Sequence, residues 1–344
     1  MTASRAIHDA GFSLVEMIVA TALTAALVAS VFSTVQSSRA AFDTGVELAD
    51  MQQRVRVAVD ALTRGLANAG AGAYAAGRVG PLNRYFAPVL PFRQGLSGDS
   101  APGSFRSDTI TLISVPSTAA QTTLAADLLP GVATLQAAAG AACPAGTNLC
   151  GFVPGMTVIV YDDTGNIDAF TVASVADASS QLTLTERPAD SAGTTYRSGS
   201  NIVEARLDVY YLNADAATQT FQLMHYDGSA NADVPVVDHI VGLTFDYEGD
   251  PVSGPGALVP ISAGELSDGP WRPDATNANR WDADLLRIRR IGVTLRVEAS
   301  SAALRGPAGV LFVNGGSSHA ANTWAPDQEV HFQVSPRNLN QARE

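Results

Sequence analysis

The sequence contains no lysine, and all 21 of its basic residues are arginine. It has 33 acidic residues, so the formal net charge is −12 at pH 7. Proteins that bind nucleic acid neutralise phosphates with clustered basic side chains, and this acidic chain shows no basic stripe. We therefore expect no nucleic-acid partner.

Cysteine is scarce, because Cys143 and Cys150 are the only two in the chain. Two cysteines this close in sequence predict a disulfide if the protein is exported to an oxidising compartment. The bridge would close a small loop, and loop closure gives it a stabilisation of roughly 2–3 kcal/mol. We expect it to pin one local loop in a weakly patterned region, residues 117–150.

Motifs of the common catalytic classes are missing. The chain has no His-Glu-x-x-His zinc sequence, no Gly-x-Ser-x-Gly nucleophile elbow and no Walker loop. Four histidines lie scattered over residues 225–331 without the spacing of metal ligands. We therefore expect neither enzymatic activity nor a cofactor.

Two weaker patterns leave alternatives open. Asp162, Asp163 and Asp168 give residues 162–168 the oxygen density of a calcium loop, but the distal bidentate glutamate is missing. A hairpin turn with solvated acids is favoured over this weak metal site. The tryptophans at 271, 281 and 324 allow a glycan platform on an adhesin, although scattered core or interface aromatics are favoured.

A long uncharged apolar run near the beginning is the dominant feature of the sequence. After Glu16 no charge appears until Arg39, and about 20 apolar residues suffice for a helix to cross a bilayer. A short polar leader, residues 1–11, precedes the run, which is not the order of an ordinary signal peptide. An acid at membrane depth costs about 2.5–3.5 kcal/mol, so Glu16 either snorkels to the headgroups or has a function.

Helical periodicity continues after the apolar run. Apolar residues recur three or four positions apart and predict one stripe on an amphipathic helix: Leu48, Met51, Val55, Val59 or Ala58, Leu62 and Leu66. The pattern predicts one helix from Phe12 to about Leu66, with a slight bend at Gly45. Glycine in residues 69–72 supplies the expected C-cap.

The remainder of the chain is predicted to be mostly β-strand, which makes the fold class α+β. Residues 73–107 are rich in glycine, proline and serine and predict a surface loop. The expected strands are 109–113, 157–161, 169–175, 181–185, 201–212, 221–226, 241–247, 285–299 and 329–334, with 201–212 and 221–226 forming a hairpin.

The string Gly11-Phe12-Ser13-Leu14-Val15-Glu16 resembles the class III signal of type IV pilins and type II secretion pseudopilins. The resemblance implies that a prepilin peptidase cuts after Gly11 and methylates the new amino terminus, Phe12. It also implies that Glu16, the fifth mature residue, acts in subunit assembly. The transmembrane and assembly helix would be residues 12–35, and residues 36–72 would be its amphipathic continuation.

Three later stretches resemble PilW-like minor pilins: residues 236–247, Trp281 followed by 287–296, and 332–339. The resemblance implies a type IV pilin-like fold, in which the long helix packs on the antiparallel sheet of the head. It further implies that residues 108–200 form an additional β-rich subdomain and that residues 201–344 form the pilin-type antiparallel sheet. It implies a minor pilin that helps prime pilus assembly at the tip, with other major and minor pilins as partners. The helix would hold the protein in the inner membrane with its head in the periplasm, and then in the surface pilus. A type II secretion pseudopilin and a pilus-mounted adhesin are the alternatives.

Overall fold

The computed structural model describes residues 13–73, 80–94, 105–185, 193–215, 220–227, 233–252, 254, 256–267, 283–307 and 324–341; at 36–41, 220 and 283 it describes only the backbone. The fold class is α+β, as predicted, with an amino-terminal apolar helix and antiparallel sheets. The chain divides into two compact units. One comprises residues 1–50 and 299–326, and the other comprises residues 51–298 and 327–344.

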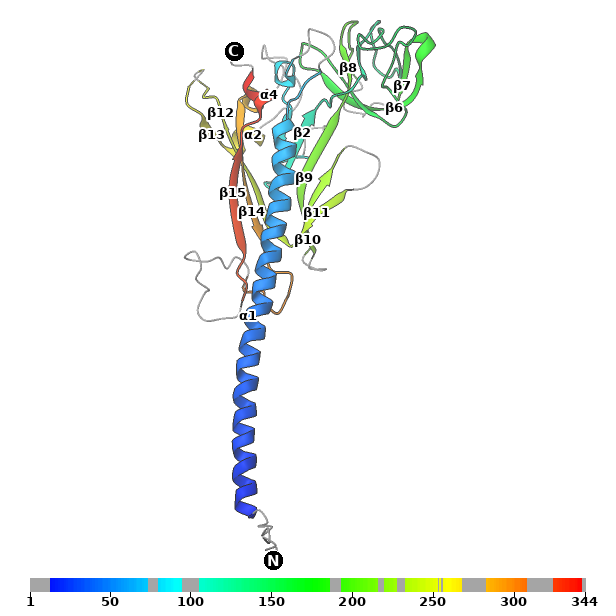
Figure 1. Ribbon diagram of the computed structural model, residues 1–344. Helices are drawn as coiled ribbons and strands as arrows, with labels where there is room; N and C mark the ends of the chain where they lie inside the picture. Colours follow the sequence, from blue (N-terminus) through cyan, green and yellow to red (C-terminus); the bar gives the residue numbers. More distant parts are fainter. Residues whose placement is uncertain are drawn as a thin grey trace, which may run out of the picture. The chain divides into compact units, whose positions relative to one another are not determined.

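Helix α1 (Leu14–Asn68) is one uninterrupted helix of 55 residues, in agreement with the predicted span (Figure 1). At 1.5 Å per residue it is about 80 Å long. Gly45 lies inside it without breaking it. The helix is followed by Gly70 with φ +76°, whose carbonyl accepts a hydrogen bond from Leu82 N at 3.0 Å. Glycine adopts this left-handed conformation without strain, so the predicted glycine C-cap is confirmed.

The last part of α1, within the second unit, carries the predicted apolar stripe. Met51, Ala58, Leu62 and Leu66 are fully buried. Of the two alternatives that the sequence allowed at one position of the stripe, Ala58 is therefore the buried residue and Val59 is not. Gly65 allows the helix to approach Tyr210 closely, and the Tyr210 hydroxyl donates to the carbonyl of Ala61 at 3.4 Å. The stripe therefore packs on strand β9.

Two antiparallel sheets of the second unit adjoin the last part of α1. The five-stranded sheet has the order β1 (Val89–Pro91), β2 (Thr109–Ser114), β9 (Arg206–Asp215), β10 (Thr220–Tyr226) and β11 (Val234–Asp238). The four-stranded sheet has the order β13 (Val259–Ile261), β12 (Ile240–Gly249), β14 (Ile288–Val297) and β15 (Gln328–Val334). The rings of Phe92 and Tyr247 meet edge to face at 5.5 Å between centroids, which ties β12 to the segment after β1.

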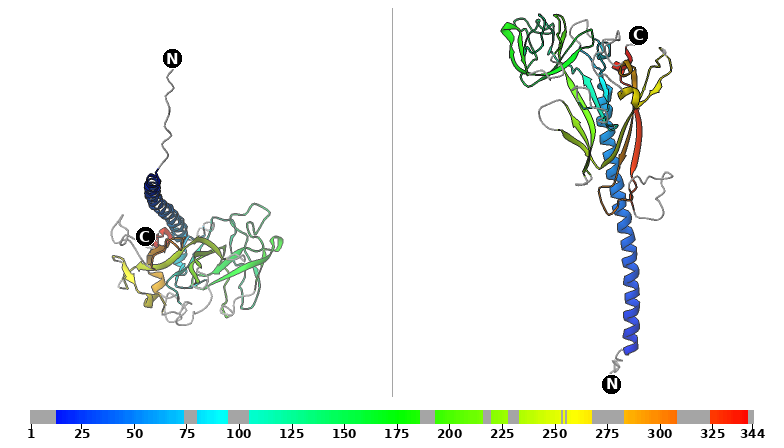
Figure 2. Two further views of the ribbon diagram at one scale, coloured as in Figure 1. Left: turned by 90° about the horizontal axis from the view of Figure 1, so that it is seen from below. Right: turned by 180° about the vertical axis from the view of Figure 1, so that it is seen from behind.

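A six-stranded antiparallel sheet forms an additional β-rich subdomain with its own core. Its order is β3 (Gln121–Thr123), β8 (Asn201–Glu204), β5 (Thr157–Tyr161), β6 (Ile167–Ala176), β7 (Gln181–Leu184) and β4 (Thr134–Gln136). Buried apolar side chains from residues 120–202 pack together in this core. The chain continues from β8 into β9, and Figure 1 and the right-hand view of Figure 2 show the green strands of this subdomain at that end of β9.

The observed boundaries of this subdomain differ from the expected ones. Strand β2 was expected inside it, but pairs with β9 in the five-stranded sheet. The expected strand 201–212 is two strands, because the chain passes at Ala205 from β8 in one sheet to β9 in the other. Alternating apolar residues continue across Ala205, so the pattern alone did not reveal the change of sheet.

The described residues of the region 73–107 do more than form the expected surface loop. It contains the 3-10 turn η1 (Leu82–Arg84) and strand β1, and Leu82, Phe86 and Leu90 are fully buried. Glycine and proline predict turns correctly, but they do not report whether the apolar residues between them are covered. The ring of Phe86 meets that of Tyr161 at 5.4 Å, so this segment contacts the six-stranded sheet.

Short helices complete the described elements: η2 (Asp177–Ser179), α2 (Ala263–Ser267), α3 (Ala283–Leu286) and α4 (Arg337–Asn340). The predicted strand 285–299 begins later than expected, because Leu285 and Leu286 belong to α3. The predicted hairpin is confirmed, since β9 and β10 pair antiparallel from Asp215 opposite Thr220 onward.

Candidate functional site

The amino-terminal segment of α1 begins with a capping box. The backbone N–H of Ser13 donates to Glu16 Oε2 at 2.9 Å, and the N–H of Glu16 donates to the Ser13 hydroxyl at 3.2 Å. A serine followed three positions later by glutamate satisfies two amides that a helix start leaves without partners. The negative carboxylate also lies at the positive end of the helix dipole. Ser-x-x-Glu is a capping signal that the sequence carries and that was not among the predictions.

The same arrangement starts α2. Ser262 N and Ser262 Oγ both donate to Glu265 Oε2, at 2.8 and 2.7 Å, and Glu265 N donates back to Ser262 Oγ. These hydrogen bonds from Ser262 are the largest cause of the lowered pKa of Glu265. A capping box is thus an ordinary structural role for glutamate in this chain, and any other role for Glu16 must be separable from it.

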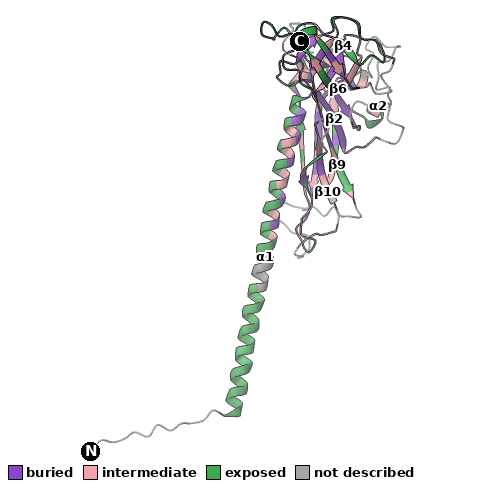
Figure 3. Ribbon diagram, turned by 90° about the vertical axis from the view of Figure 1, so that its right-hand side faces the viewer, coloured by how far each residue is buried: buried purple, intermediate pink, exposed green. Residues whose placement is uncertain are grey.

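After Glu16 the helix presents apolar side chains on all sides. Leu14 is 76% exposed and Phe32 is 66% exposed, and large apolar residues between them are also exposed (Figure 3). Placed at 100° per residue, these side chains surround the helix and form no single stripe. A helix that is apolar all round requires an apolar environment, either lipid or a protein core.

Hydroxyl groups in this segment are satisfied within the helix. Thr21 donates to the carbonyls of Met17 and Ile18, both at 2.9 Å, and Thr24 donates to Ala20 O at 2.8 Å. Ser30 and Thr34 donate to Leu27 O and Ser30 O in the same way. Such bonds let serine and threonine lie in apolar surroundings without an unpaired donor.

Leu14–Val35 is thus a helical segment of 22 residues that is long and apolar enough to cross a membrane. Glu16 is its only ionisable side chain. The predicted processing residues Gly11 and Phe12 lie outside the described residues. Of the predicted amino-terminal site, the structure therefore places Glu16 and its partner Ser13.

Glu47, farther along α1, forms hydrogen bonds with the segment that follows β14. Both Glu47 and this segment belong to the first unit. Its Oε1 accepts from the Ser300 hydroxyl at 2.8 Å and from the Ser300 backbone N–H. Arg305 Nε donates to Ala299 O at 2.8 Å and Arg305 Nη2 to Ser300 O at 3.0 Å. Hydrogen bonding of a nearly buried carboxylate to neighbouring backbone indicates a structural role. Nothing in the helical periodicity indicated this contact.

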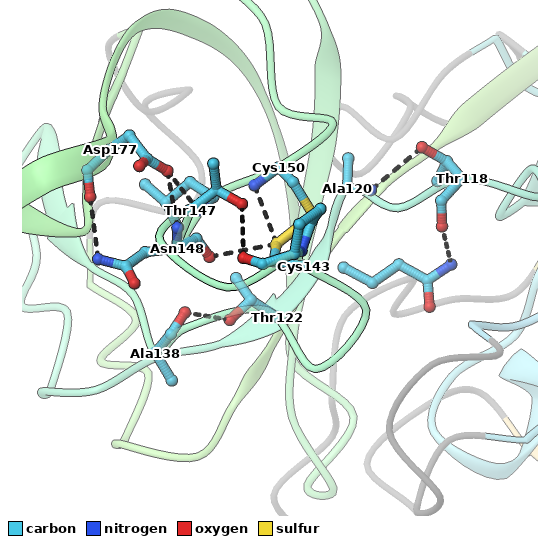
Figure 4. Close-up of a disulfide and its surroundings, with 12 residues drawn as sticks. Thr118, Ala120, Thr122, Ala138, Cys143, Thr147, Asn148, Cys150 and Asp177 are labelled. Atoms are coloured by element: carbon cyan, nitrogen blue, oxygen red, sulfur yellow. Dashed lines mark hydrogen bonds between the residues drawn. A yellow bond between two sulfur atoms is a disulfide. The ribbon is translucent and has the colours of Figure 1, made fainter.

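Cys143 and Cys150 form the predicted disulfide, with their Cα atoms 5.4 Å apart (Figure 4). The loop is fixed from a second side by Asp177, whose Oδ1 accepts from Asn148 N at 2.9 Å and from Leu149 N at 2.7 Å. The bridge therefore closes a local loop of the six-stranded subdomain, in the region where strand patterning is weak, and Asp177 fastens that loop to η2.

The aspartates of residues 162–168 are used inside the β5–β6 hairpin. Asp162 Oδ1 accepts from Thr164 N at 2.9 Å and from Asn166 N at 3.0 Å, which is the pattern of an aspartate-stabilised turn. Asp168 Oδ2 accepts from the Tyr196 hydroxyl at 2.8 Å. The predicted hairpin turn is confirmed, but of its three aspartates only Asp163 is exposed, whereas Asp162 and Asp168 are half-buried and hydrogen-bonded. Within the described ranges, no three His, Cys, Asp or Glu side chains are grouped to hold a metal ion.

The described histidines lie apart and have separate partners. His225 Nε2 lies 2.7 Å from Asp208 Oδ1, and His331 Nδ1 lies 3.1 Å from the Thr294 hydroxyl. Trp324 packs against Gly306 in the first unit, while Trp271 and Trp281 lie outside the described residues. Scattered core or interface aromatics therefore remain the favoured interpretation, with the glycan platform as the alternative.

The chain matches no protein-family model and none of the curated proteins. The resemblance to type IV pilins therefore rests on sequence motifs alone. The apolar segment with its single capped glutamate is the feature of the described structure that bears most directly on function.

Proposed function

We propose that this protein is a minor pilin that helps prime assembly of a type IV pilus. The signal-like string of residues 11–16, which runs into the apolar segment Leu14–Val35, is the observation that carries the proposal. In this proposal a prepilin peptidase removes residues 1–11, and the helix anchors the protein in the inner membrane before it enters the filament. The antiparallel sheets form the outward head of a type IV pilin-like fold.

Glu16 supplies the recruitment step. In the membrane its carboxylate attracts the positive amino terminus that processing creates on a neighbouring subunit. At contact in a medium of low dielectric this attraction is worth several kcal/mol, although desolvation of both charges offsets part of it. Because the helix is otherwise apolar over 22 residues, this one contact fixes the register of two neighbouring helices.

The role is structural, with other major and minor pilins as partners, and it involves no catalysis. Two alternatives use the same helix. A pseudopilin of a type II secretion system would assemble in a short filament that serves protein export. An adhesin would use the pilin helix only as a mount for its head, whose loops and additional subdomain would bind a surface.

Deletion of the protein distinguishes these roles. We expect cells without it to carry few or no surface pili, and we expect wild-type protein supplied in trans to restore them. Electron microscopy gives the pilus number, and immunoblotting of sheared filaments shows whether the protein is incorporated. Normal pilus number with reduced surface binding would favour the adhesin. Normal pilus number with reduced protein export would favour the pseudopilin, and either result would contradict the priming role.

A further inference from the structure

An open hollow of about 380 Å³ lies where two distant parts of the chain meet in the second unit. Arg84 of η1, Arg337 and Asn340 of α4, and Gln341 line it. The volume is at the lower end of the range for small-molecule sites in proteins. Two guanidinium groups and two carboxamides give this hollow a cationic, hydrogen-bonding lining.

The two segments are locked together, so the arginines are held by a rigid frame. Asn83 Nδ2 donates to Leu339 O at 3.1 Å and joins η1 to α4. Leu82 and Leu339 are buried, and Leu339 lies against Gly70 at the end of α1. Asn340 Nδ2 donates to Pro336 O at 2.9 Å and to Arg289 O at 3.3 Å. A site whose supporting residues are fixed before binding loses less entropy when a ligand arrives.

The charges of these two arginines are available to a ligand. Several of the described arginines in the second unit face carboxylates; examples are Arg287 with Asp284, Arg289 with Asp250 and Arg290 with Glu248. Arg84 and Arg337 are exposed, and no carboxylate within the described part of the chain forms an ion pair with either. Within the described residues, two guanidinium groups without an ion pair therefore belong to the lining of one hollow.

The charge of Arg84 influences the pKa of the neighbouring residue, Tyr85. Burial raises the pKa of the Tyr85 hydroxyl, the positive charge of Arg84 opposes that rise, and Asp163 adds to it. The charge of Arg84 therefore acts on its neighbours.

We propose that this hollow binds a small ligand through an oxyanion group, either a carboxylate or a phosphate. Guanidinium groups bind both with two parallel hydrogen bonds, which gives geometric specificity as well as charge complementarity. The Nδ2 hydrogens of Asn340 are already used, so Gln341 and Asn340 Oδ1 remain for hydroxyl groups of the ligand. This binding is separate from the proposed role in filament assembly and does not depend on it.

Calorimetric titration of the full chain in non-ionic detergent micelles tests the proposal. Inorganic phosphate and glucuronate serve as probes, one for each oxyanion. We expect saturable binding of at least one probe, and the stronger one identifies the preferred group. Arg84→Gln and Arg337→Gln should each weaken binding about tenfold or more, because each removes a charge-assisted pair. Arg337→Lys keeps the charge but loses the planar fork, so it should weaken binding as well.

Arg197→Gln is the matched control. Arg197 is also exposed and without an ion pair among the described residues, but it follows Tyr196 of the six-stranded subdomain's core and does not line the hollow. This variant has the same net charge as the other glutamine variants and should bind within about twofold of wild type, because it removes no group from the lining of the hollow. Absence of saturable binding of both probes by the folded wild type would overturn the proposal. So would an equal loss in Arg197→Gln, since binding would then reflect only net charge.

Discussion

Cells that produce the Glu16→Gln protein are expected to carry few or no surface pili while containing normal amounts of the protein. Glutamine at the third helical position can still accept the hydrogen bond from Ser13 N, so the capping box persists. The negative charge is lost, and with it the attraction to the amino terminus of a neighbouring subunit. Insertion into the membrane becomes easier, because an ionised group has been removed from the apolar segment. Pilus counts by electron microscopy and immunoblots of membranes measure the two quantities.

Two companion variants separate charge from capping. Ser13→Ala keeps the carboxylate but removes the hydroxyl that caps Glu16 N, at a cost of about 1 kcal/mol in helix stability. Because the charge remains, we expect near-normal pili. Glu16→Ala removes the charge and also the carboxylate that accepts from Ser13 N, while the Ser13 hydroxyl can still cap the amide of residue 16. This variant should match Glu16→Gln. Normal pilus number in Glu16→Gln together with loss in Glu16→Ala would show that Glu16 acts as a helix cap and that its charge recruits no subunit.

Substitution of Gly65 by alanine is expected to destabilise the packing of α1 on β9. A Cβ atom at Gly65 would lie 2.6 Å from Cε2 and from the hydroxyl oxygen of Tyr210. The tyrosine ring cannot move away easily, because it stacks on His225 at 4.6 Å between centroids, and Asp208 holds that histidine. Overpacking of this kind costs about 1–3 kcal/mol, which exceeds the gain of about 0.5–1 kcal/mol from replacing a helical glycine.

Hydrogen exchange measures this effect locally. Peptides that cover β9 and β10 should exchange several-fold faster in Gly65→Ala, since about 1.4 kcal/mol corresponds to a tenfold change in the opening equilibrium. Gly45→Ala is the matched control on the same helix, because its Cβ would meet nothing within 4 Å. That variant should leave β9 and β10 unchanged and stabilise the helix by about 0.5–1 kcal/mol. Equal exchange in the two variants would refute the close packing of Gly65 on Tyr210.

The helix and most individual strands were predictable, because each depends on a local pattern. The spacing of Met51, Leu62 and Leu66 predicts one face of a helix, and these residues are buried as expected. Strand β5 was predicted with its observed bounds. The assignment of strands to sheets was harder to predict. Strands such as β2 and β8 show similar local patterns, but they belong to different sheets. That choice depends on contacts between distant residues.

The candidate sites also differ in whether a local sequence pattern reveals them. Glu16 stands out because it is the only charge in an apolar run, and Cys143 has only Cys150 to pair with. Arg84 and Arg337 could not be associated from the sequence, since the hollow forms only when η1 and α4 dock at the end of α1. The partnership of Glu47 with Ser300 likewise joins residues whose local patterns are unrelated.

The mature amino terminus tests the central claim most directly. Mass spectrometry of the full protein extracted from membranes of cells that contain a prepilin peptidase determines where the chain begins. The proposal predicts a chain that starts at Phe12 with one added methyl group on its amine, and full retention of residues 1–11 in the same cells without the peptidase. A chain that still begins at Met1 when the peptidase is present would contradict the assignment as a pilin.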